Sequence, residues 1–345
     1  MPNHNLKFSI LIPSYNGADV IDEAIKSVIN QGYKNYEIVI NDDASKDATL
    51  YKIKSIANKR IRLFKNKKNL GYPGNLNQCL SHAKGDIIYL LGQDDILSPD
   101  ALLKTNKAFT MSDDIGAVTR PYRWFDEDLD VTVRARLPLN SKKDETVKIT
   151  DEPAKIVEVF KSLDSLSALG YRAKFMDRPF HPDIFPCHVY PFASIFKKHP
   201  IIFLKDYVSS VSMRNSQCWH LSSIYNKSPM LSWVEMFENV FPEKRFAKLR
   251  KYCIENFVAI NYVGLAQIKN YSYREYGYTL REIAYLLKFR HKNILSPLFW
   301  FFSLGALITP RKLLIPAIDL YKKHVNKIKF KDIKFKSSFS KTSAV

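Results

Sequence analysis

The chain has 345 residues, of which 46% are hydrophobic and 25% charged, and this balance excludes wholesale disorder. Four cysteines without a CxxC pair argue against a disulfide framework or a zinc site and favour a reducing, cytoplasmic compartment. The formal net charge of +19 requires an anionic partner, which can be a nucleic acid, an anionic membrane or an acidic substrate. Residues 1–17 lack a charged region followed by a long apolar run, so they predict a strand and not a secretory signal.

Residues 1–120 alternate short apolar runs with helical patterns. The apolar runs predict buried strands at 7–13, 37–41, 61–64, 86–91 and 115–118, with helices between them at 18–31, 47–57, 74–83 and 100–109. This order predicts an α/β fold with a Rossmann-like, mostly parallel sheet that helices flank on both faces. Ligands of such sheets bind at the carboxyl ends of the strands, so we look for functional residues there.

The rest of the chain is expected to complete this domain and then to become helical. Residues 121–225 are rich in charged and aromatic side chains, with helices predicted at 152–169 and 189–198 and a strand pair within 201–213. This part would bind the second substrate and supply catalytic groups. Residues 226–345 predict a helical, basic C-terminal region.

Residues 294–309 form an apolar stretch of 16 residues without a charge. A membrane-spanning helix needs about 20 residues, so this stretch is short for a span. Basic residues flank it, and residues 311–345 carry ten Lys or Arg against two Asp, which is +8 of the +19. Basic charge beside an apolar helix favours in-plane attachment to an anionic membrane over nucleic-acid binding. A buried core helix and a true span are the alternatives.

Polar clusters follow three of the predicted strands. Residues 13–17 read PSYNG, residues 41–49 read NDDASKDAT and residues 92–95 read GQDD. The adjacent carboxylates of Asp94 and Asp95 repel each other, and a divalent Mn²⁺ or Mg²⁺ would relieve this repulsion. Such a metal would bridge the phosphates of a bound nucleotide. An acidic turn without a ligand is the alternative.

A loop with two glycines precedes the helix predicted at 74–83. Gly71 and Gly74 allow a ligand to approach the backbone closely, and a helix N-terminus favours anionic groups. Residues 69–77, NLGYPGNLN, match neither the GxxxxGKS/T phosphate loop nor the GxGxxG dinucleotide fingerprint. The loop therefore predicts an anion site of another kind.

Four motifs, in this order and spacing, resemble glycosyltransferase family 2, whose members have the GT-A fold: IPSYNG, NDDASKDAT, NLGYPGNLNQCLSHAKGD and LLGQDD. The resemblance is close over residues 6–120 and loose over 170–225. It implies an enzyme that moves a sugar from a nucleotide-sugar, typically a UDP-sugar, to a glycan or lipid-linked acceptor with inversion. Together with the basic, apolar C-terminus, it indicates bacterial surface polysaccharide or lipopolysaccharide biosynthesis at the inner face of the cell membrane.

The residues that the resemblance assigns to the donor site lie in all four motifs. Pro13 and Tyr15 of the first motif would wall the nucleobase. In the second motif, Asp43 would hydrogen-bond the base and Asp42 would support it. Those of the glycine loop would lie near the ribose or the diphosphate. In chain order the assigned residues are Pro13, Tyr15, Asn16, Asp42, Asp43, Gly71, Asn75, Gln93 and Asp94.

Residues 93–95 match the metal motif of the family, which is often written DxD and here begins with Gln93. The resemblance therefore implies that Asp95 contacts the metal and that Asp94 contacts the ribose or the metal. His220 is a further candidate metal ligand, with a solvated helix residue as the alternative. The implied cofactor is a divalent metal, Mn²⁺ or Mg²⁺.

The sequence departs from the family at the catalytic base. Family members carry a Glu-Asp pair whose Asp activates the acceptor hydroxyl, and the corresponding positions here are Cys187 and His188. An imidazole can act as a general base near neutral pH, so His188 is the first candidate and Asp183 its rival. A structural histidine and a loop carboxylate are the respective alternatives, and Arg214 matches the family's arginine. The missing pair leaves open a nucleotide-sugar-binding scaffold without catalysis.

Overall fold

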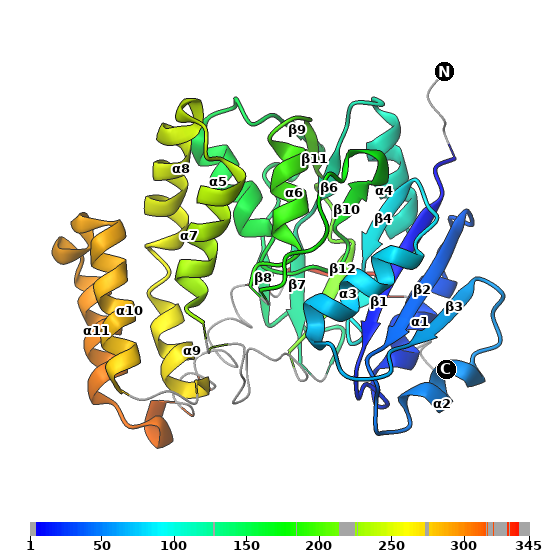
Figure 1. The fold of residues 1–345 in the computed structure, drawn as a ribbon, viewed down its shortest axis with the longest axis horizontal. Coiled ribbons are helices and arrows are strands. Elements are labelled where there is room, and N and C mark those ends of the chain that lie inside the picture. Colours follow the sequence, from blue (N-terminus) through cyan, green and yellow to red (C-terminus); the bar gives the residue numbers. More distant parts are fainter. Residues whose placement is uncertain are drawn as a thin grey trace.

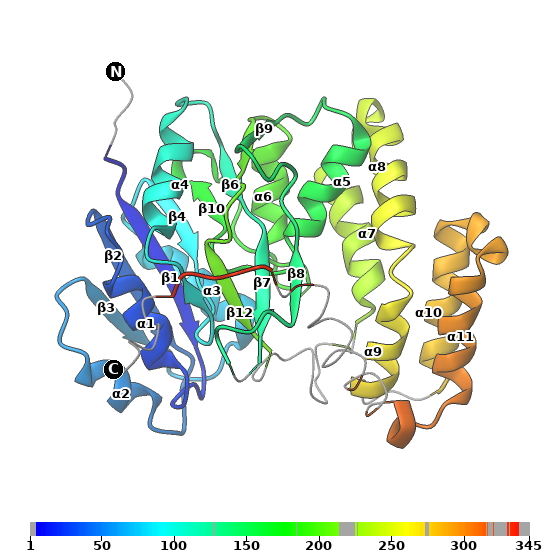
Figure 2. The same cartoon turned by 180° about the vertical axis from the view of Figure 1, so that it is seen from behind.

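A computed structural model describes residues 5–126, 128–183, 185–213, 225, 227–272, 276–314, 316, 320, 330 and 332–337 (Figure 1). Strands and helices alternate through the first half of this structure, and helices alone follow from Pro229 onward. Figures 1 and 2 show the strands gathered toward one end of the molecule and the last helices at the other.

An eight-stranded sheet forms the centre of the first half. Among its described strands, only β10 and β9 run antiparallel to their neighbours, so β1, β2 and β4 end at the same edge. The predicted α/β fold with a mostly parallel sheet is therefore confirmed. In spatial order the strands are β3 (Ile61–Lys65), β2 (Tyr36–Asp42), β1 (Phe8–Ser14), β4 (Ile87–Leu90), β10 (Gly170–Arg172), β6 (Ala117–Thr119), β11 (Ile201–Phe203) and β9 (Glu145–Val147).

Helices cover both faces of this sheet because its strands are apolar on both sides. In β1, Phe8, Ile10 and Ile12 belong to one core and Leu11 to the other, since side chains alternate along a strand. The first core includes residues of α1 (Ile21–Ile29), α2 (Thr49–Ser55) and α4 (Ala101–Thr110). The second includes residues of α3 (Gly71–His82), α5 (Pro153–Ser162) and α6 (Val189–Phe196), with η1 (Ala173–Phe175) packed against it.

A second sheet begins one residue after Asp95. Its strand order is β5 (Ile96–Leu97), β12 (Ser209–Ser212), β7 (Tyr122–Phe125) and β8 (Arg134–Arg136). Because β12 pairs with β5, it brings residues more than a hundred positions away in the sequence beside the predicted metal motif.

The helical C-terminal extension is confirmed. It comprises α7 (Pro229–Val240), η4 (Lys244–Phe246), α8 (Ala247–Cys253), η5 (Ile254–Val258), α9 (Val263–Tyr271), α10 (Tyr276–Phe289), η6 (His291–Leu295) and α11 (Pro297–Ile308). Aromatic packing joins this extension to the first half, because the rings of Phe160 in α5 and Phe237 in α7 lie 4.7 Å apart. Figure 1 places α10 and α11 farthest from the eight-stranded sheet.

The apolar stretch 294–309 divides into two elements, η6 and α11. Ser296 caps α11 by accepting a hydrogen bond from the backbone N–H of Phe299, and Pro297 is its first residue. Of the helices in the described part of the chain, none has the length and apolar character that a transmembrane segment needs.

Two segments differ from the sequence-based expectation. The helix predicted at 152–169 ends at Ser162, and the chain turns back through Ala168, whose φ of 69° is left-handed, into β10. Residues 332–337, predicted within the helical basic region, are not helical. Phe335 lies in a small cluster with Ile96 and Phe125 on the second sheet, which the apolar pattern of the sequence could not indicate.

Phe335 should anchor this C-terminal segment to the second sheet. The guanidinium of Arg123 lies 4.7 Å from the centre of its ring, and the hydroxyl of Thr132 donates a 2.7 Å hydrogen bond to the carbonyl of Ile333. We expect Phe335→Ala to lower the free energy of unfolding by about 1–2 kcal/mol, less than the ~3–5 kcal/mol of a core phenylalanine, because the segment can detach locally. Urea denaturation measures the change, with the exposed Lys336→Ala as control. A change within about 0.5 kcal/mol, as for ordinary surface positions, would contradict the anchor.

Candidate functional site

The turn after β1 is fixed by the side chain of Gln93. Its Oε1 accepts hydrogen bonds from the hydroxyl of Ser14 (3.1 Å) and the backbone N–H of Tyr15 (3.0 Å), and its Nε2 donates to the carbonyl of Tyr15 (3.1 Å). A Cβ at Gly17 would collide with Gln93 Oε1, so a larger residue there would displace this amide. The amide of Gln93 therefore holds the first motif against the fourth.

The turns after β1 and β2 are bound to each other. Asn16 has a left-handed φ of 46°, its N–H donates to Ser45 Oγ, and its Oδ1 accepts from the N–H of Lys46, both at 2.9 Å. Gly17 N–H donates to Thr49 Oγ1 at 2.8 Å. Beside them the Tyr15 side chain is exposed, whereas Pro13 is buried within β1. The two predicted motifs thus form one rigid rim.

Two buried aspartates lie at the end of β2: Asp42 is its last residue and Asp43 follows it. Asp43 Oδ1 accepts hydrogen bonds from Asn66 Nδ2 and the N–H of Leu70, both at 2.8 Å, which holds the loop before Gly71 (φ 75°) against β2. Asp42 Oδ2 accepts from the N–H of Ser45 at 3.0 Å, while its buried Oδ1 has no partner in the described structure. A buried carboxylate oxygen without a partner is costly, and a bound ligand or water would relieve that cost.

Asn75 is buried beneath this rim and its amide is fully engaged. Its Nδ2 donates to the carbonyls of Asn41 (3.0 Å) and Ser14 (3.2 Å), and its Oδ1 accepts from Asn41 Nδ2 (2.6 Å) and Asn66 Nδ2 (3.3 Å). Asn75 therefore ties α3 to the ends of β1 and β2.

Asp94 and Asp95 converge beside Gly92. A Cβ built on Gly92 would lie 2.8 Å from Asp95 Oδ2 and 3.2 Å from Asp94 Oδ1, so these two oxygens share one small space. Asp95 is buried, with its Oδ1 accepting from the N–H of Ser212 (2.9 Å) and its Oδ2 from the hydroxyl of Ser167 (2.5 Å). Asp94 makes no side-chain hydrogen bond to another residue in the described ranges.

The electrostatic state of this pair follows from its burial. Burial, with the neighbouring charge of Asp95, raises the pKa of Asp94 to about 8, and burial raises the pKa of Asp95 to about 6 despite its hydrogen bonds. The charge of Arg120 opposes the rise at Asp95. No lysine or arginine of the described structure forms an ion pair with either carboxylate. The two carboxylates therefore lie close together with no basic side chain of the described residues to neutralise them. Such a pair of oxygen ligands fits a hard divalent metal such as Mn²⁺ or Mg²⁺.

Arg120 is a site residue that the sequence analysis missed. It is fully buried and donates hydrogen bonds to the carbonyls of Ser162, Ser165 and Ser167 at 2.7–2.9 Å. These bonds shape the 162–167 loop, whose Ser167 hydroxyl holds Asp95. The sequence carries no local signal for this role, because the two segments meet only through the fold.

The two candidate bases lie in one loop that α3 holds. Asn77, which the sequence analysis did not single out, exchanges two 2.9 Å hydrogen bonds with the backbone of Phe180, and its place in the third motif was the available signal. The Asp183 carboxylate forms an ion pair with Lys227, which also pairs with Glu235.

His188 is buried at the start of α6. Its Nε2 donates a 2.7 Å hydrogen bond to the carbonyl of Leu163, while its Nδ1 has no partner in the described ranges. Burial lowers the pKa of His188 to about 4, so the ring is neutral at pH 7 and Nδ1 is an unprotonated acceptor. This is the protonation state that a general base requires.

Two further predicted residues, Arg214 and His220, lie outside the described residues. In the described ranges, no group of three or more His, Cys, Asp or Glu side chains forms a metal site. Of the predicted metal ligands, Asp94 and Asp95 are therefore the two that the described residues include.

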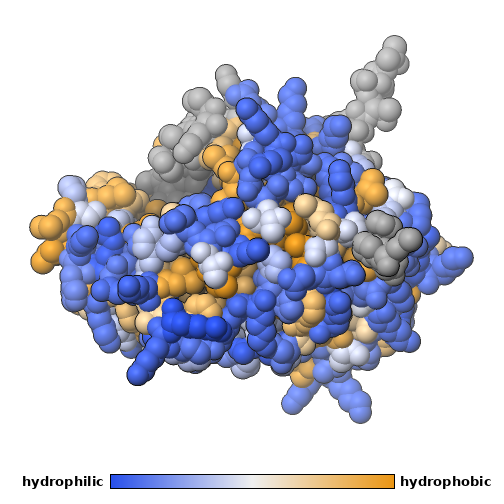
Figure 3. All heavy atoms as spheres, turned by 90° about the horizontal axis from the view of Figure 1, so that it is seen from above, coloured by the Kyte–Doolittle hydropathy of each residue, from blue (hydrophilic) through white to orange (hydrophobic). Residues whose placement is uncertain are grey.

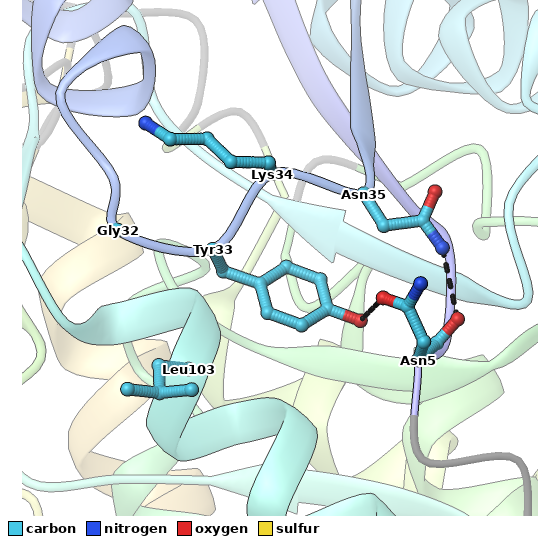
Figure 4. Close-up of a pocket in the computed structure, with 6 residues that line it drawn as sticks. All are labelled: Asn5, Gly32, Tyr33, Lys34, Asn35 and Leu103. Carbon is cyan, nitrogen blue, oxygen red and sulfur yellow. Dashed lines mark hydrogen bonds between the residues drawn. The ribbon is translucent and has the colours of Figure 1, made fainter.

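A cavity of about 580 Å³ lies at the opposite edge of the sheet (Figure 4). It is lined by residues that precede β1 and β2, among them Asn5 and Tyr33, and by Leu103 of α4. Its polar groups bond to one another, as the 3.0 Å bond from Tyr33 Oη to Asn5 Oδ1 shows. It contains none of the predicted site residues, so the carboxyl edge remains the candidate site.

Comparison with known proteins bears on the family and the fold of the chain. The family model described as "Glycosyl transferase family 2" matches residues 9–161, somewhat less than half of the chain. Residues 9–161 belong to glycosyltransferase family 2. A structure of Staphylococcus aureus TarS 1–349 in complex with UDP superimposes with a TM-score of 0.60 at 16% identity, covering 91% of each chain. The chain therefore has the GT-A fold.

Two curated relatives share the family region. One is UDP-Glc:alpha-D-GlcNAc-diphosphoundecaprenol beta-1,3-glucosyltransferase WfgD of Escherichia coli, 36% identical over 108 residues, which are 29% of this chain and 43% of WfgD. The other is the cholesterol galactosyltransferase of Borreliella burgdorferi, 31% identical over 163 residues, or 46% of this chain and 42% of that protein. The chain thus matches about two-fifths of the length of these relatives.

The raised pKa values predict a pH-dependent stability for the metal-free family 2 protein. A folded-state pKa of about 8 at Asp94 lies above the unfolded value of about 3.9, so the folded protein binds more protons between these values. Stability should therefore fall as pH rises from about 4 to 8, and Asp94→Asn should flatten this slope and raise the melting temperature at pH 8. Thermal denaturation in EDTA from pH 5 to 8 measures it, with the exposed Asp113→Asn as control. If the melting temperatures of wild type and Asp94→Asn fell with the same slope from pH 5 to 8, Asp94 would not have the raised pKa on which this prediction depends.

Gly92→Ala should damage the carboxylate pair directly. The added methyl group would lie within 3.2 Å of both aspartate side chains, so at least one of them must move. We expect metal-dependent nucleotide binding to weaken by at least about tenfold, which corresponds to ~1.4 kcal/mol. Isothermal titration measures it, and Gly32→Ala, where an added methyl group meets nothing within 4 Å, is the matched control. Equal affinities for wild type and Gly92→Ala would contradict the assignment.

Proposed function

We propose that this protein is a glycosyltransferase that moves a sugar from a UDP-sugar to a hydroxyl group of a glycan or lipid-linked acceptor, with inversion at the anomeric carbon. The observation that carries the proposal is the converging Asp94–Asp95 pair at the carboxyl edge, next to the rim formed by the turns after β1 and β2. The family membership of residues 9–161 supports glycosyl transfer as the reaction class.

In this proposal the donor lies along the rim. Tyr15 and Pro13 face the nucleobase, Asp43 offers its remaining oxygen to it, and Asp42 and Asn16 support this arrangement. UDP is favoured because TarS, with the same fold, was solved with UDP and because the name of WfgD states a UDP-sugar. Gln93 and Asn75 act by positioning, since their amides are already engaged with the strand ends.

The proposed cofactor is a divalent metal held by Asp95 and Asp94, with His220 as a further candidate ligand. When bound, it would supply positive charge to the departing diphosphate. The glycines expected in a loop form the first turn of α3, which begins at Gly71, and this turn would place backbone N–H groups near the same phosphates.

The proposed general base is His188. It would take the proton of the acceptor hydroxyl at Nδ1, while its Nε2–H donates to the carbonyl of Leu163 and so fixes the tautomer. Asp183 is the rival base, but its charge is paired with Lys227, and Arg214 remains the candidate that matches the family's arginine. The positive charge that develops on the sugar in the transition state would be stabilised by the nearby carboxylates.

The acceptor is proposed to be carried by a lipid of the cell membrane. Both curated relatives are named for acceptors that are lipids or lipid-linked, diphosphoundecaprenol and cholesterol. We therefore propose that the protein acts in bacterial surface polysaccharide or lipopolysaccharide biosynthesis, on the inner face of the membrane. A second candidate is a nucleotide-sugar-binding scaffold without catalysis, favoured by Cys187 and His188 at the positions of the Glu-Asp pair.

Nucleotide binding tests the donor site. We expect UDP with Mn²⁺ to raise the melting temperature, because a ligand at a hundred times its Kd stabilises the folded state by about 2.7 kcal/mol. The shift should vanish in EDTA and in Asp95→Ala, and GDP and dTDP should give smaller shifts. Asp113→Ala, an exposed aspartate outside the site, is the matched control. If no nucleotide shifts the melting temperature of the wild type, with or without metal, the donor site is wrong.

Turnover distinguishes the two bases and the scaffold. His188→Gln should lower kcat by about 10²–10⁴ while the UDP-induced shift remains, since the base acts on the acceptor and not on the nucleotide. Asp183→Asn should change kcat by less than about tenfold. The reverse result would make Asp183 the base, and UDP binding without turnover or donor hydrolysis by the wild type would favour the scaffold.

A further inference from the structure

Five exposed apolar side chains form a stripe that we call the outer stripe: Leu295 at the end of η6, and Leu298, Phe301, Leu304 and Ile308 of α11. Leu295, Phe301 and Ile308 are 83%, 71% and 75% exposed. The spacing of three or four residues places them along one side of the helix. A surface helix of a globular protein normally presents polar side chains outward, so this stripe needs a partner.

The inner face shows that α11 is already packed. Phe299, Ser303 and Ala306 are buried, and the Phe299 ring lies 5.6 Å from that of Tyr262. At the end of the helix, Arg311 donates hydrogen bonds to the carbonyls of Lys269 (2.6 Å) and Ser272 (2.8 Å). The outer stripe is therefore presented by a fixed helix whose other side belongs to the core.

Basic side chains frame the outer stripe. Lys288 and Lys292 precede α11, Lys312 follows it, and all three are exposed. Trp300 is partly exposed, and its indole N–H is satisfied by a 2.8 Å bond to the carbonyl of Ile294. Apolar residues between basic ones, with a tryptophan at their border, are what the interface of an anionic bilayer binds.

The dimensions favour a helix that lies in the plane of the membrane. Twelve residues of α11 extend about 18 Å, which is well short of the ~30 Å hydrocarbon core. A second copy of this chain fits less well, because a symmetric contact would oppose the same lysines in a protein of net charge +19.

The position of the helix keeps a membrane contact apart from the candidate site. Figure 1 places α11 at the end of the molecule farthest from the eight-stranded sheet, and Figure 3 shows hydrophobic atoms exposed at that end. In Figure 1 the chain after α11 lies at the lower side of the molecule, toward which β1 and β2 also run. A bilayer against the outer stripe would therefore contact the molecule at the end away from this sheet and leave the carboxyl edge uncovered.

We propose that α11 is an in-plane membrane anchor that inserts the outer stripe into an anionic bilayer. The membrane contact is inferred from the exposure and packing of α11 alone. Its role, which is to bring the site to a lipid-borne acceptor, rests on the proposed function. The partner is defined by its chemistry: acyl chains for the stripe and anionic headgroups for Lys288, Lys292 and Lys312.

Vesicle flotation of the full chain tests the anchor. We expect wild type to float with vesicles of phosphatidylcholine and 30% phosphatidylglycerol, and to bind pure phosphatidylcholine at least about tenfold more weakly. Leu298→Ser/Phe301→Ser/Ile308→Ser should reduce anionic binding by at least about tenfold. Leu103→Ser/Met111→Ser/Leu137→Ser removes exposed apolar side chains elsewhere and should bind like the wild type. Lys288→Gln/Lys292→Gln/Lys312→Gln should abolish the preference for anionic vesicles.

Three results would overturn the anchor. They are no flotation of the wild type, equal losses in the two serine triples, and a dimer in sedimentation that only the α11 triple dissolves. The UDP-induced thermal shift, measured on the same variants, keeps the two proposals apart. The α11 triple should retain this shift, whereas its absence in a wild type that floats would refute the donor site and leave the anchor standing.

Discussion

The buried carboxylate of Asp95 is the constraint on which the rest of the site depends. The neighbouring Gly92 gives it room, and two segments distant in the sequence hold it: Ser167 donates to one oxygen, and the backbone of Ser212 donates to the other. The pairing of β5 with β12 delivers Ser212, and the three carbonyls that Arg120 binds shape the loop of Ser167. A second carboxylate, Asp94, is then forced into the same small space. The fold thus maintains a repulsion that a divalent cation would remove.

The sequence was sufficient to predict the sheet and its functional edge. Apolar runs such as 37–41 are buried strands, and parallel strands bring the polar residues that follow them to one edge by geometry alone. The orientation of individual amides was not predictable in this way. Gln93 and Asn75 occupy motif positions, but their side-chain amides hydrogen-bond to the backbone at the ends of β1 and β2. An amide beside the end of a strand finds unpaired backbone groups there. Arg120 and Ser167 carry no local pattern, and only the folded chain brings them to Asp95.

The proposal that His188 is the general base depends on how the fold surrounds its imidazole. A carboxylate is unprotonated above its pKa of about 4, and an ordinary imidazole only above about 6.5. Burial lowers the pKa of His188 to about 4, so the imidazole is unprotonated over nearly the same pH range as an ordinary carboxylate. The carbonyl of Leu163 fixes which nitrogen carries the proton, and Asn77 fixes the loop to α3. Packing has thereby given a histidine the titration range of an aspartate.

The packing of the helical extension would orient the whole molecule at a membrane. A lipid-borne hydroxyl group diffuses in two dimensions, so an enzyme held at the bilayer meets it more often than one in solution. Attachment to the bilayer is useful only if the site also faces the acceptor, and attachment through a flexible tail would not fix that orientation. Here α11 packs through Phe299 and Ala306, and Arg311 ties its end to α9, so a membrane contact along α11 would fix the direction of the carboxyl edge. The distribution of charge agrees, because the exposed Lys288, Lys292 and Lys312 flank α11 in the sequence, whereas no lysine or arginine of the described residues forms an ion pair with Asp94 or Asp95.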